Sequence, residues 1–140
     1  MSRIFLDTNI FIYIFENHPQ YGKDAAILRN RIHERGDELI TSWMTVAEVQ
    51  IRPRATGNDG LAALIKQLII QGSTIIGFDE AAAETYTQIR INTGIKGPDA
   101  IQLACAAAAG VELFVTNDQR LARLRIPGIH FITSLDRVPI

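Results

Sequence analysis

The chain has 140 residues and a net charge of −1, so it is long enough for one domain and carries no excess positive charge to attract a polyanion. Hydrophobic residues make up 47% of the sequence, which excludes an intrinsically disordered chain. The one cysteine, Cys105, excludes an internal disulfide and suits a reducing cytoplasm. No apolar run reaches the roughly 18 to 20 residues that span a bilayer, and Asp7 interrupts the first apolar stretch before a secretory signal could form. We therefore expect a single cytoplasmic domain over residues 1–140, with no membrane partner.

In the first half of the chain, short apolar runs alternate with amphipathic stretches. Ile4–Leu6 predicts a buried strand that ends at Asp7. The side chains of Asp7, Thr8 and Asn9 can cap a following helix, and Pro53 suits the end of a later one. The elements expected here are a strand at 4–6, helices at 10–15 and 23–35, a strand at 39–41, a helix at 44–52 and a loop at 55–60.

The second half continues this alternation. Asp79 suits the N-cap of a helix, and Pro98 suits the first position of an alanine-rich helix that ends at Gly110. An apolar stripe predicts a helix at 61–72 and is formed by Leu61, Leu64, Ile65, Leu68 and Ile69. The remaining elements expected are strands at 74–76, 112–116 and 130–132 and a short helix at 119–124. Strands that alternate with helices predict a parallel sheet covered by helices on both faces.

Four acidic residues fall where such a sheet would bring them to one edge. Asp7 follows the first strand, and Asp118 follows the strand at 112–116. Glu48 lies in the helix after the second strand, and Asp99 lies in the first turn of the alanine-rich helix. Because parallel sheets build sites at the carboxyl ends of their strands, these four side chains can converge.

Converging carboxylates require a cation or protons. At an effective dielectric constant near 20, two carboxylates about 4 Å apart repel by roughly 4 kcal/mol. Hard divalent cations such as Mg²⁺ prefer oxygen ligands, and two such ions can activate water and stabilise the leaving oxygen in phosphodiester hydrolysis. The three histidines lack metal-ligand spacing, and no phosphate-binding glycine motif is present.

Each of these residues also has an ordinary structural interpretation. Asp7 and Asp118 can cap helices, and Asp99 favours a helix N-terminus. Glu48 can pair with Arg52 four residues later on a helix. Thr8, Asn9, Thr116 and Asn117 are common turn and capping residues. These interpretations leave the joint arrangement of the four acids unexplained.

Other side chains have weaker signals. Six basic residues are candidates for phosphate contacts, and Arg52 and Lys96 rank first because they lie near the acids in sequence; the others are Arg54, Arg120, Arg123 and Arg125. Cys105 fits as a small core residue. The aromatic side chains of Phe11, Tyr13, Phe15 and Trp43 fit a core or an interface better than a platform for stacked bases.

Four short motifs resemble those of the PIN domain family, and within it those of the VapC-type toxin ribonucleases. They are Phe5-Leu6-Asp7-Thr8-Asn9, Thr45-Val46-Ala47-Glu48-Val49, Pro98-Asp99-Ala100-Ile101-Gln102-Leu103-Ala104 and Phe114-Val115-Thr116-Asn117-Asp118. The resemblance covers essentially the whole chain, in order and with family-like spacing. It implies a three-layer α/β/α sandwich around a central parallel sheet of four to five strands.

The resemblance also implies an activity. It is endonucleolytic cleavage of RNA that depends on Mg²⁺, with Mn²⁺ as a substitute, by Asp7, Glu48, Asp99 and Asp118. Thr116 matches a hydroxyl position that supports the metal or the attacking water. Thr8, Asn9 and Asn117 are expected to support the site, and Arg52, Lys96 and Arg120 to bind the substrate. VapC-type proteins usually form homodimers and are inhibited by a cognate antitoxin.

Three other functions remain open at this stage. A haloacid-dehalogenase-like phosphatase also begins with an apolar strand that ends in Asp, but it needs a second Asp where this chain has Asn9. A PIN nuclease that is not a toxin would share all four acids. A non-catalytic module that binds RNA or protein on the same scaffold would not need them.

Overall fold

A five-stranded parallel sheet forms the centre of the computed structural model, which describes residues Met1–Ile140. Its strands are β1 (Arg3–Leu6), β2 (Glu38–Ser42), β3 (Thr74–Ile76), β4 (Leu113–Val115) and β5 (Phe131–Thr133). The strand order is β3-β2-β1-β4-β5, and every neighbouring pair is parallel. β1 therefore lies in the middle, where a strand is buried on both faces and reads as a continuous apolar run.

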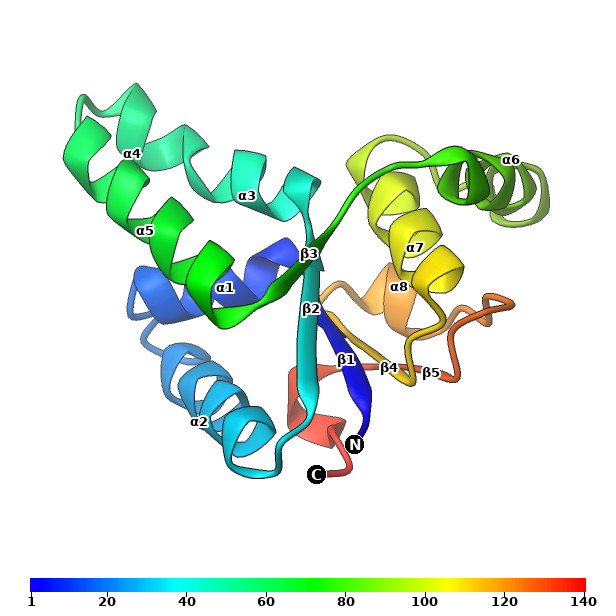
Figure 1. The fold of residues 1–140 in the computed structure, drawn as a ribbon, viewed down its shortest axis with the longest axis horizontal. Coiled ribbons are helices and arrows are strands. Elements are labelled where there is room, and N and C mark those ends of the chain that lie inside the picture. The colour runs from blue at the N-terminus through cyan, green and yellow to red at the C-terminus, as the bar shows by residue number, and fades with distance from the viewer.

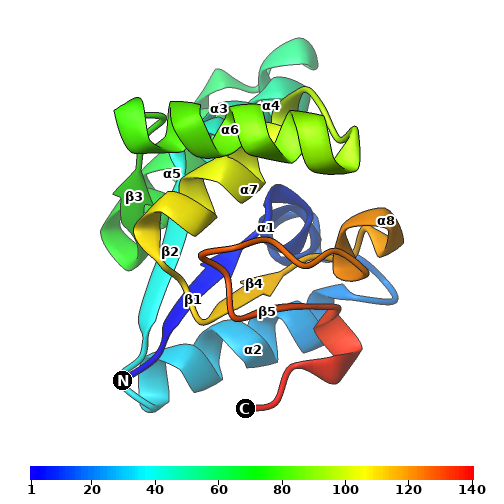
Figure 2. The same cartoon turned by 90° about the vertical axis from the view of Figure 1, so that its right-hand side faces the viewer.

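Helices cover both faces of the sheet, as Figures 1 and 2 show. One face carries α1 (Thr8–Phe15), α2 (Gly22–Glu34), α3 (Trp43–Val49), α4 (Ile51–Ala55) and α5 (Asp59–Gly72). The other carries α6 (Glu80–Thr93), α7 (Pro98–Ala109) and α8 (Gln119–Ala122). A single 3-10 turn, Leu135–Arg137, follows β5. The three-layer α/β/α sandwich is thus confirmed. None of the helices combines the length and apolar character that crossing a bilayer demands.

The two faces of the sheet bury separate apolar cores. Ile4 and Leu6 of β1 point into the core beneath α1, α2, α3 and α5. Phe5 points the opposite way, into the core beneath α7, and stacks on Phe114 of β4 with ring centroids 4.9 Å apart. Cys105 is buried in α7, in agreement with its expected role as a small core residue. Because β1 packs against both cores, its position is fixed, and so is that of Asp7, which follows it.

Helix boundaries mostly follow the capping signals of the sequence. The Asp79 carboxylate accepts a hydrogen bond from the backbone N–H of Ala82 at 2.9 Å, and Pro98 opens α7. Gly110 ends α7 in the left-handed conformation. Each of these residue types prefers its position for a local reason: Asp accepts from free helix N–H groups, Pro fits the first helical turn and Gly adopts a positive φ. The sequence therefore locates these helix ends well.

One predicted helix was wrong in extent. The expected helix at 44–52 is divided into α3 and α4 at Gln50, and Pro53 lies inside α4 rather than beyond a helix end. Pro53 is tolerated there because it is the third residue of α4, where a backbone N–H has no partner within the helix. The expected loop at 55–60 is correspondingly shorter, since Asn58 caps α5 through the backbone N–H of Leu61 at 3.1 Å.

Two groups of apolar side chains are less buried than their sequence pattern suggests. Ile65 and Ile69 of α5 are buried, but Leu61, Leu64 and Leu68 are exposed, so the inner face of α5 is narrower than the sequence stripe. Trp43 is 52% exposed, so of its two expected locations, a core or an interface, the core is excluded. Periodicity identifies apolar positions, but it does not say how many of them a neighbouring helix will cover.

A close backbone approach near β5 gives a test of this packing. Gly128 has φ of +100°, and a Cβ there would lie 2.5 Å from the carbonyl oxygen of Ala107 in α7. Gly57 also has a positive φ, of +80°, but a Cβ there would meet nothing within 4 Å.

We expect Gly57→Ala to lower the free energy of unfolding by about 1 kcal/mol through left-handed strain alone. Gly128→Ala should lower it by about 1 to 3 kcal/mol more, because α7 or the turn must shift. Urea unfolding of both variants measures the difference, and equal losses would show that α7 and this turn are not tightly packed.

Candidate active site

The pairing of β1 with β4 brings Asp7 beside Thr116. Leu6 pairs with Val115, so Asp7 and Thr116 follow their strands at the same level of the sheet. The Thr116 hydroxyl donates to Oδ2 of Asp7 at 2.8 Å, and the backbone N–H of Thr8 donates to Oδ1 at 2.8 Å. Asp7 therefore caps α1 and faces the sheet edge at once, so its capping and site interpretations do not compete.

Asp7 is a buried carboxylate without a cationic partner. Its relative exposure is 6%, and no ion pair involves it. Burial raises the pKa of Asp7 to about 6, although hydrogen bonds from Thr116 and Thr8 oppose this and the nearby charge of Asp99 adds to it. A buried anion in this state would be stabilised by a cation at the sheet edge.

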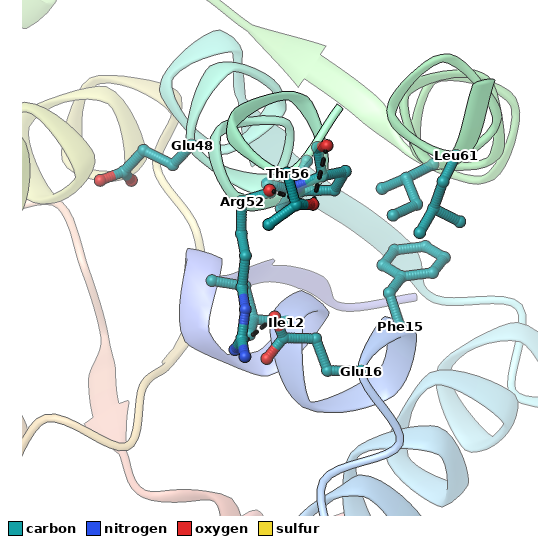
Figure 3. A pocket seen from close by; sticks show the side chains of 10 residues that line it. Ile12, Phe15, Glu16, Glu48, Arg52, Thr56 and Leu61 are labelled. Atoms are coloured by element: carbon teal, nitrogen blue, oxygen red, sulfur yellow. Dashed lines mark hydrogen bonds and ion pairs between the residues drawn. The ribbon is translucent and has the colours of Figure 1, made fainter. Parts of the chain in front are cut away.

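Glu48 points toward the N-terminal end of α1, next to Asp7, rather than toward Arg52. The Thr8 hydroxyl donates to Oε1 of Glu48 at 2.8 Å. Arg52 pairs instead with Glu16, which follows α1, at 3.1 Å. Figure 3 shows Glu48 turned away from that pair, at the rim of a pocket between α1 and α3–α5. The expected Glu48–Arg52 pair was wrong because the helix breaks at Gln50, so the two residues do not share one continuous helical face.

Asp99 and Asp118 converge on a guanidinium group. Nη2 of Arg120 donates to Asp99 at 2.8 Å and to Asp118 at 2.7 Å, and Nε donates to Asp118 at 3.2 Å. The hydrogen bonds from the Arg120 side chain hold the pKa of Asp118 below its usual range. Asp118 also caps α8 by accepting from the backbone N–H of Arg120 at 3.0 Å, so the capping interpretation holds here too.

The four acids thus lie at one sheet edge but are not preassembled into a metal cage. No three His, Cys, Asp or Glu side chains are grouped closely enough to hold a metal ion as they stand. The donor set still fits a hard divalent cation, because it consists of carboxylate oxygens. Two of the acids already share a cation, that of Arg120, and the buried Asp7 has none. Thr116 adds a buried hydroxyl beside Asp7.

Most of the expected supporting residues contact this group. The amide of Asn9 donates to the Thr116 hydroxyl oxygen at 3.4 Å, and the backbone N–H of Asp118 donates to the same oxygen at 3.1 Å. The side chain of Asn117 reaches the Tyr13 hydroxyl at 3.3 Å, so it ties β4 to α1 rather than contacting an acid. Lys96 is exposed on the turn before α7, close in sequence to Asp99.

Gln102 is a site residue that the sequence analysis missed. It is 1% exposed, and its Nε2 donates toward Thr45 at 2.7 Å, Thr8 at 3.1 Å and Asp7 at 3.3 Å. The Ser42 hydroxyl oxygen accepts the backbone N–H of Thr45, so its own proton is free to donate to Oε1 of Gln102. These bonds fix the orientation of the amide. The available signal was a lone amide in an apolar helix, three residues after Asp99.

The raised pKa of Asp7 predicts a pH dependence of stability. Because the folded protein binds this proton more tightly than the unfolded chain does, the Asp7 contribution to stability is fully present below about pH 4 and is lost as pH rises through about 6. In EDTA, Asp7→Asn should therefore gain stability relative to wild type between pH 4 and 7, by up to about 3 kcal/mol.

Asp118→Asn is the control of opposite sign. Its pKa is lowered by Arg120, so its loss should destabilise the protein at neutral pH, and less so in acid. Denaturant unfolding across the pH range measures both variants. A Asp7→Asn difference that does not change with pH would contradict the buried, unpaired carboxylate.

Gln102 predicts a second stability difference. Gln102→Leu replaces the amide with an apolar side chain of similar size and leaves buried hydroxyls without their amide partner, so we expect a loss of about 2 kcal/mol. Gln67 lies exposed on α5, and Gln67→Leu should change stability by less than about 0.5 kcal/mol. Equal effects of the two substitutions in urea unfolding would show that the buried amide network contributes nothing.

The fold is similar to that of chains in several solved toxin–antitoxin structures. A chain of VapBC2 from Rickettsia felis, bound to a DNA fragment from the VapBC2 promoter, has a TM-score of 0.77 and 19% identity. The match covers 94% of this chain and 98% of that one. A chain of DNA-bound VapBC from Salmonella typhimurium has a TM-score of 0.74 and 23% identity, and the match covers 96% of this chain and 99% of that one. VapC20 from Mycobacterium tuberculosis, a toxin that cleaves the sarcin-ricin loop, has a TM-score of 0.64 and 13% identity. That match covers 85% of this chain and 93% of VapC20.

At these identities the likeness establishes a shared fold. No curated protein sequence matches this chain. A sequence model of the PIN domain matches residues 4–127, which is most of the chain, and the chain therefore belongs to the PIN domain family.

Proposed function

We propose that this chain is a divalent-metal-dependent endoribonuclease that hydrolyses RNA phosphodiester bonds. The observation that carries the proposal is the edge formed by Asp7, Glu48, Asp99 and Asp118, where a buried carboxylate lies beside two others that share a cation. Membership of the PIN domain family supports it. The fold shared with a toxin that cleaves the sarcin-ricin loop supports RNA as the substrate class.

In this proposal the four acids hold Mg²⁺, with Mn²⁺ as a substitute. When bound, the cation supplies Lewis acidity to the phosphodiester and makes water a better nucleophile. Asp7 is held for this task by the Thr116 hydroxyl and the backbone N–H of Thr8, and so it cannot rotate away from the sheet edge. Glu48 is held by the Thr8 hydroxyl, so Thr8 contacts both Asp7 and Glu48. Asn9 and Asn117 support Thr116 and the end of β4.

Basic residues around the edge are proposed to bind the RNA backbone. Arg120 lies directly on two of the acids, and Lys96 is exposed three residues before Asp99. Arg52 is 78% exposed at its side chain, and only a surface pair with Glu16 holds it, so it is free to exchange partners. A chain with a net charge of −1 needs such local positive charge to bind a polyanion.

We further propose that the nuclease is the toxin of a type II toxin–antitoxin pair, active in the cytoplasm. The structural neighbours include VapBC complexes from Rickettsia felis and Salmonella typhimurium, which supports a cognate antitoxin as partner. The homodimer implied by the family resemblance is part of the same proposal. A PIN nuclease that is not a toxin would share the acidic edge but would not arrest growth.

The nuclease proposal is tested by cleavage of structured RNA with Mg²⁺ or Mn²⁺. Wild type should cleave, and Asp7→Asn should lose at least about 100-fold in rate, since loss of a group that stabilises the transition state typically costs this much. Asp24→Asn, on the exposed first turn of α2, is the matched acidic control and should cleave like wild type.

Equal cleavage by wild type and Asp7→Asn would sink the nuclease proposal. A thermal scan then distinguishes what is left. A non-catalytic RNA-binding or protein-binding module without a carboxylate site should show no stabilisation by Mn²⁺. A metal-binding protein should gain roughly 2.7 kcal/mol at a hundredfold excess of Mn²⁺ over its Kd.

The toxin role has a separate readout. Induced expression of wild type without its neighbouring gene should arrest bacterial growth, and Asp7→Asn should not. Co-expression of the neighbouring reading frame should restore growth if it encodes the antitoxin. Cleavage in vitro without growth arrest would favour a PIN nuclease with another role.

A further inference from the structure

Arg120 occupies the gap between two of the proposed metal-binding acids. Its guanidinium donates three hydrogen bonds, one to Asp99 and two to Asp118, at 2.8, 3.2 and 2.7 Å. No other cationic side chain contacts any of the four acids. In this conformation Arg120 neutralises part of the charge that a divalent cation would otherwise neutralise.

The contact is suited to exchange rather than to permanent structure. The Arg120 side chain is 67% exposed, so solvent can hydrate the guanidinium as soon as it leaves the carboxylates. Ion pairs this exposed are weak, and long side chains gain conformational freedom when such pairs break. The backbone of Arg120 stays in place meanwhile, because its N–H is bound by the carboxylate of Asp118 at 3.0 Å.

We propose that Arg120 is an internal counterion that a divalent cation replaces, and that the displaced guanidinium then binds the phosphodiester of the RNA. The inference rests on the proposed function and concerns the regulation of the same site. In the metal-free protein Arg120 holds Asp99 and Asp118 together despite their repulsion. In the working enzyme the displaced guanidinium pairs with a phosphate of the substrate instead.

Charge balance favours this exchange. A divalent cation brings two positive charges to the acids and frees one on Arg120, while each RNA phosphodiester brings one negative charge. The guanidinium fork matches the two unesterified oxygens of a phosphodiester, as it matches a carboxylate. The guanidinium therefore passes from a carboxylate to a phosphodiester and is paired with an anion in both states.

The ordinary alternative is a surface ion pair that only secures the start of α8. Both interpretations predict some loss of stability when Arg120 is removed. They differ in metal binding, because only a counterion competes with the metal. They also differ in RNA binding, because only a displaced guanidinium would add a phosphate contact.

The experiment measures Mn²⁺ affinity from the electron paramagnetic resonance signal of free Mn²⁺, without RNA. Arg120→Ala should bind Mn²⁺ about threefold to tenfold more tightly than wild type, because no internal cation has to be displaced. Arg120→Lys, which keeps the charge, should stay near wild type. Arg31→Ala removes an exposed arginine in the last turn of α2 that forms no ion pair, and should match wild type.

The second readout is binding of a 2′-O-methyl RNA, which resists cleavage, in Mn²⁺. Arg120→Ala should bind it about tenfold more weakly, and the slope of log affinity against log salt should fall by about one phosphate contact. Arg31→Ala should do neither. Arg120→Gln serves as a second variant if Arg120→Ala does not fold.

The outcomes separate the two proposals. If wild type binds Mn²⁺ and Arg120→Ala binds it equally or more weakly, the counterion is refuted while the nuclease proposal stands. If Mn²⁺ affinity rises but RNA affinity is unchanged, the transfer to the phosphodiester is refuted. If wild type neither binds Mn²⁺ nor cleaves RNA, the proposed function and this inference fail together.

Discussion

Burial of one carboxylate, that of Asp7, sets the arrangement of the rest of the site. A carboxylate with 6% exposure needs donors from every side, and no helix or strand alone provides them. Here they come from three elements: Thr8 at the start of α1, Thr116 after β4 and Gln102 in α7. These contacts hold the two faces of the sandwich in register at the carboxyl end of the sheet. The two apolar cores position β1, and the position of β1 then determines where the acids meet.

Structural and chemical roles coincide in the same atoms at this edge. An ionised carboxylate has about four acceptor positions, so Asp7 can cap α1 and still accept from Thr116 and Gln102. Asp118 likewise caps α8 while it binds Arg120. The Thr8 hydroxyl has one proton and gives it to Glu48, so the amide of Gln102 is the donor that Thr8 can accept. A residue that is explained by capping is therefore not thereby excluded from the site.

The sequence predicts the strands and the placement of the acids because both depend on local signals. Apolar runs define β1 and β4, and capping residues define the starts of α6 and α7. The break at Gln50, the pairing of Arg52 with Glu16 and the exposure of Trp43 depend on how elements distant in sequence pack. Arg120 ranked below Arg52 and Lys96 among the expected phosphate contacts, although it lies only two residues from Asp118. Its second acidic partner, Asp99, lies in the first turn of α7, and only the fold brings that turn to α8.

The acidic edge and the proposed RNA substrate pose an electrostatic problem that the net charge of the chain does not solve. With a net charge of −1 there is no long-range attraction to RNA, and the four carboxylates repel it locally. A site of this kind needs a cation that stays with the acids and a second that meets the phosphate. A side chain that is paired with Asp99 and Asp118 and largely exposed can fill either position, depending on what else is bound. The attraction for RNA would then arise only when the metal has entered, which makes the local charge of the edge, rather than the charge of the protein, the quantity that controls substrate binding.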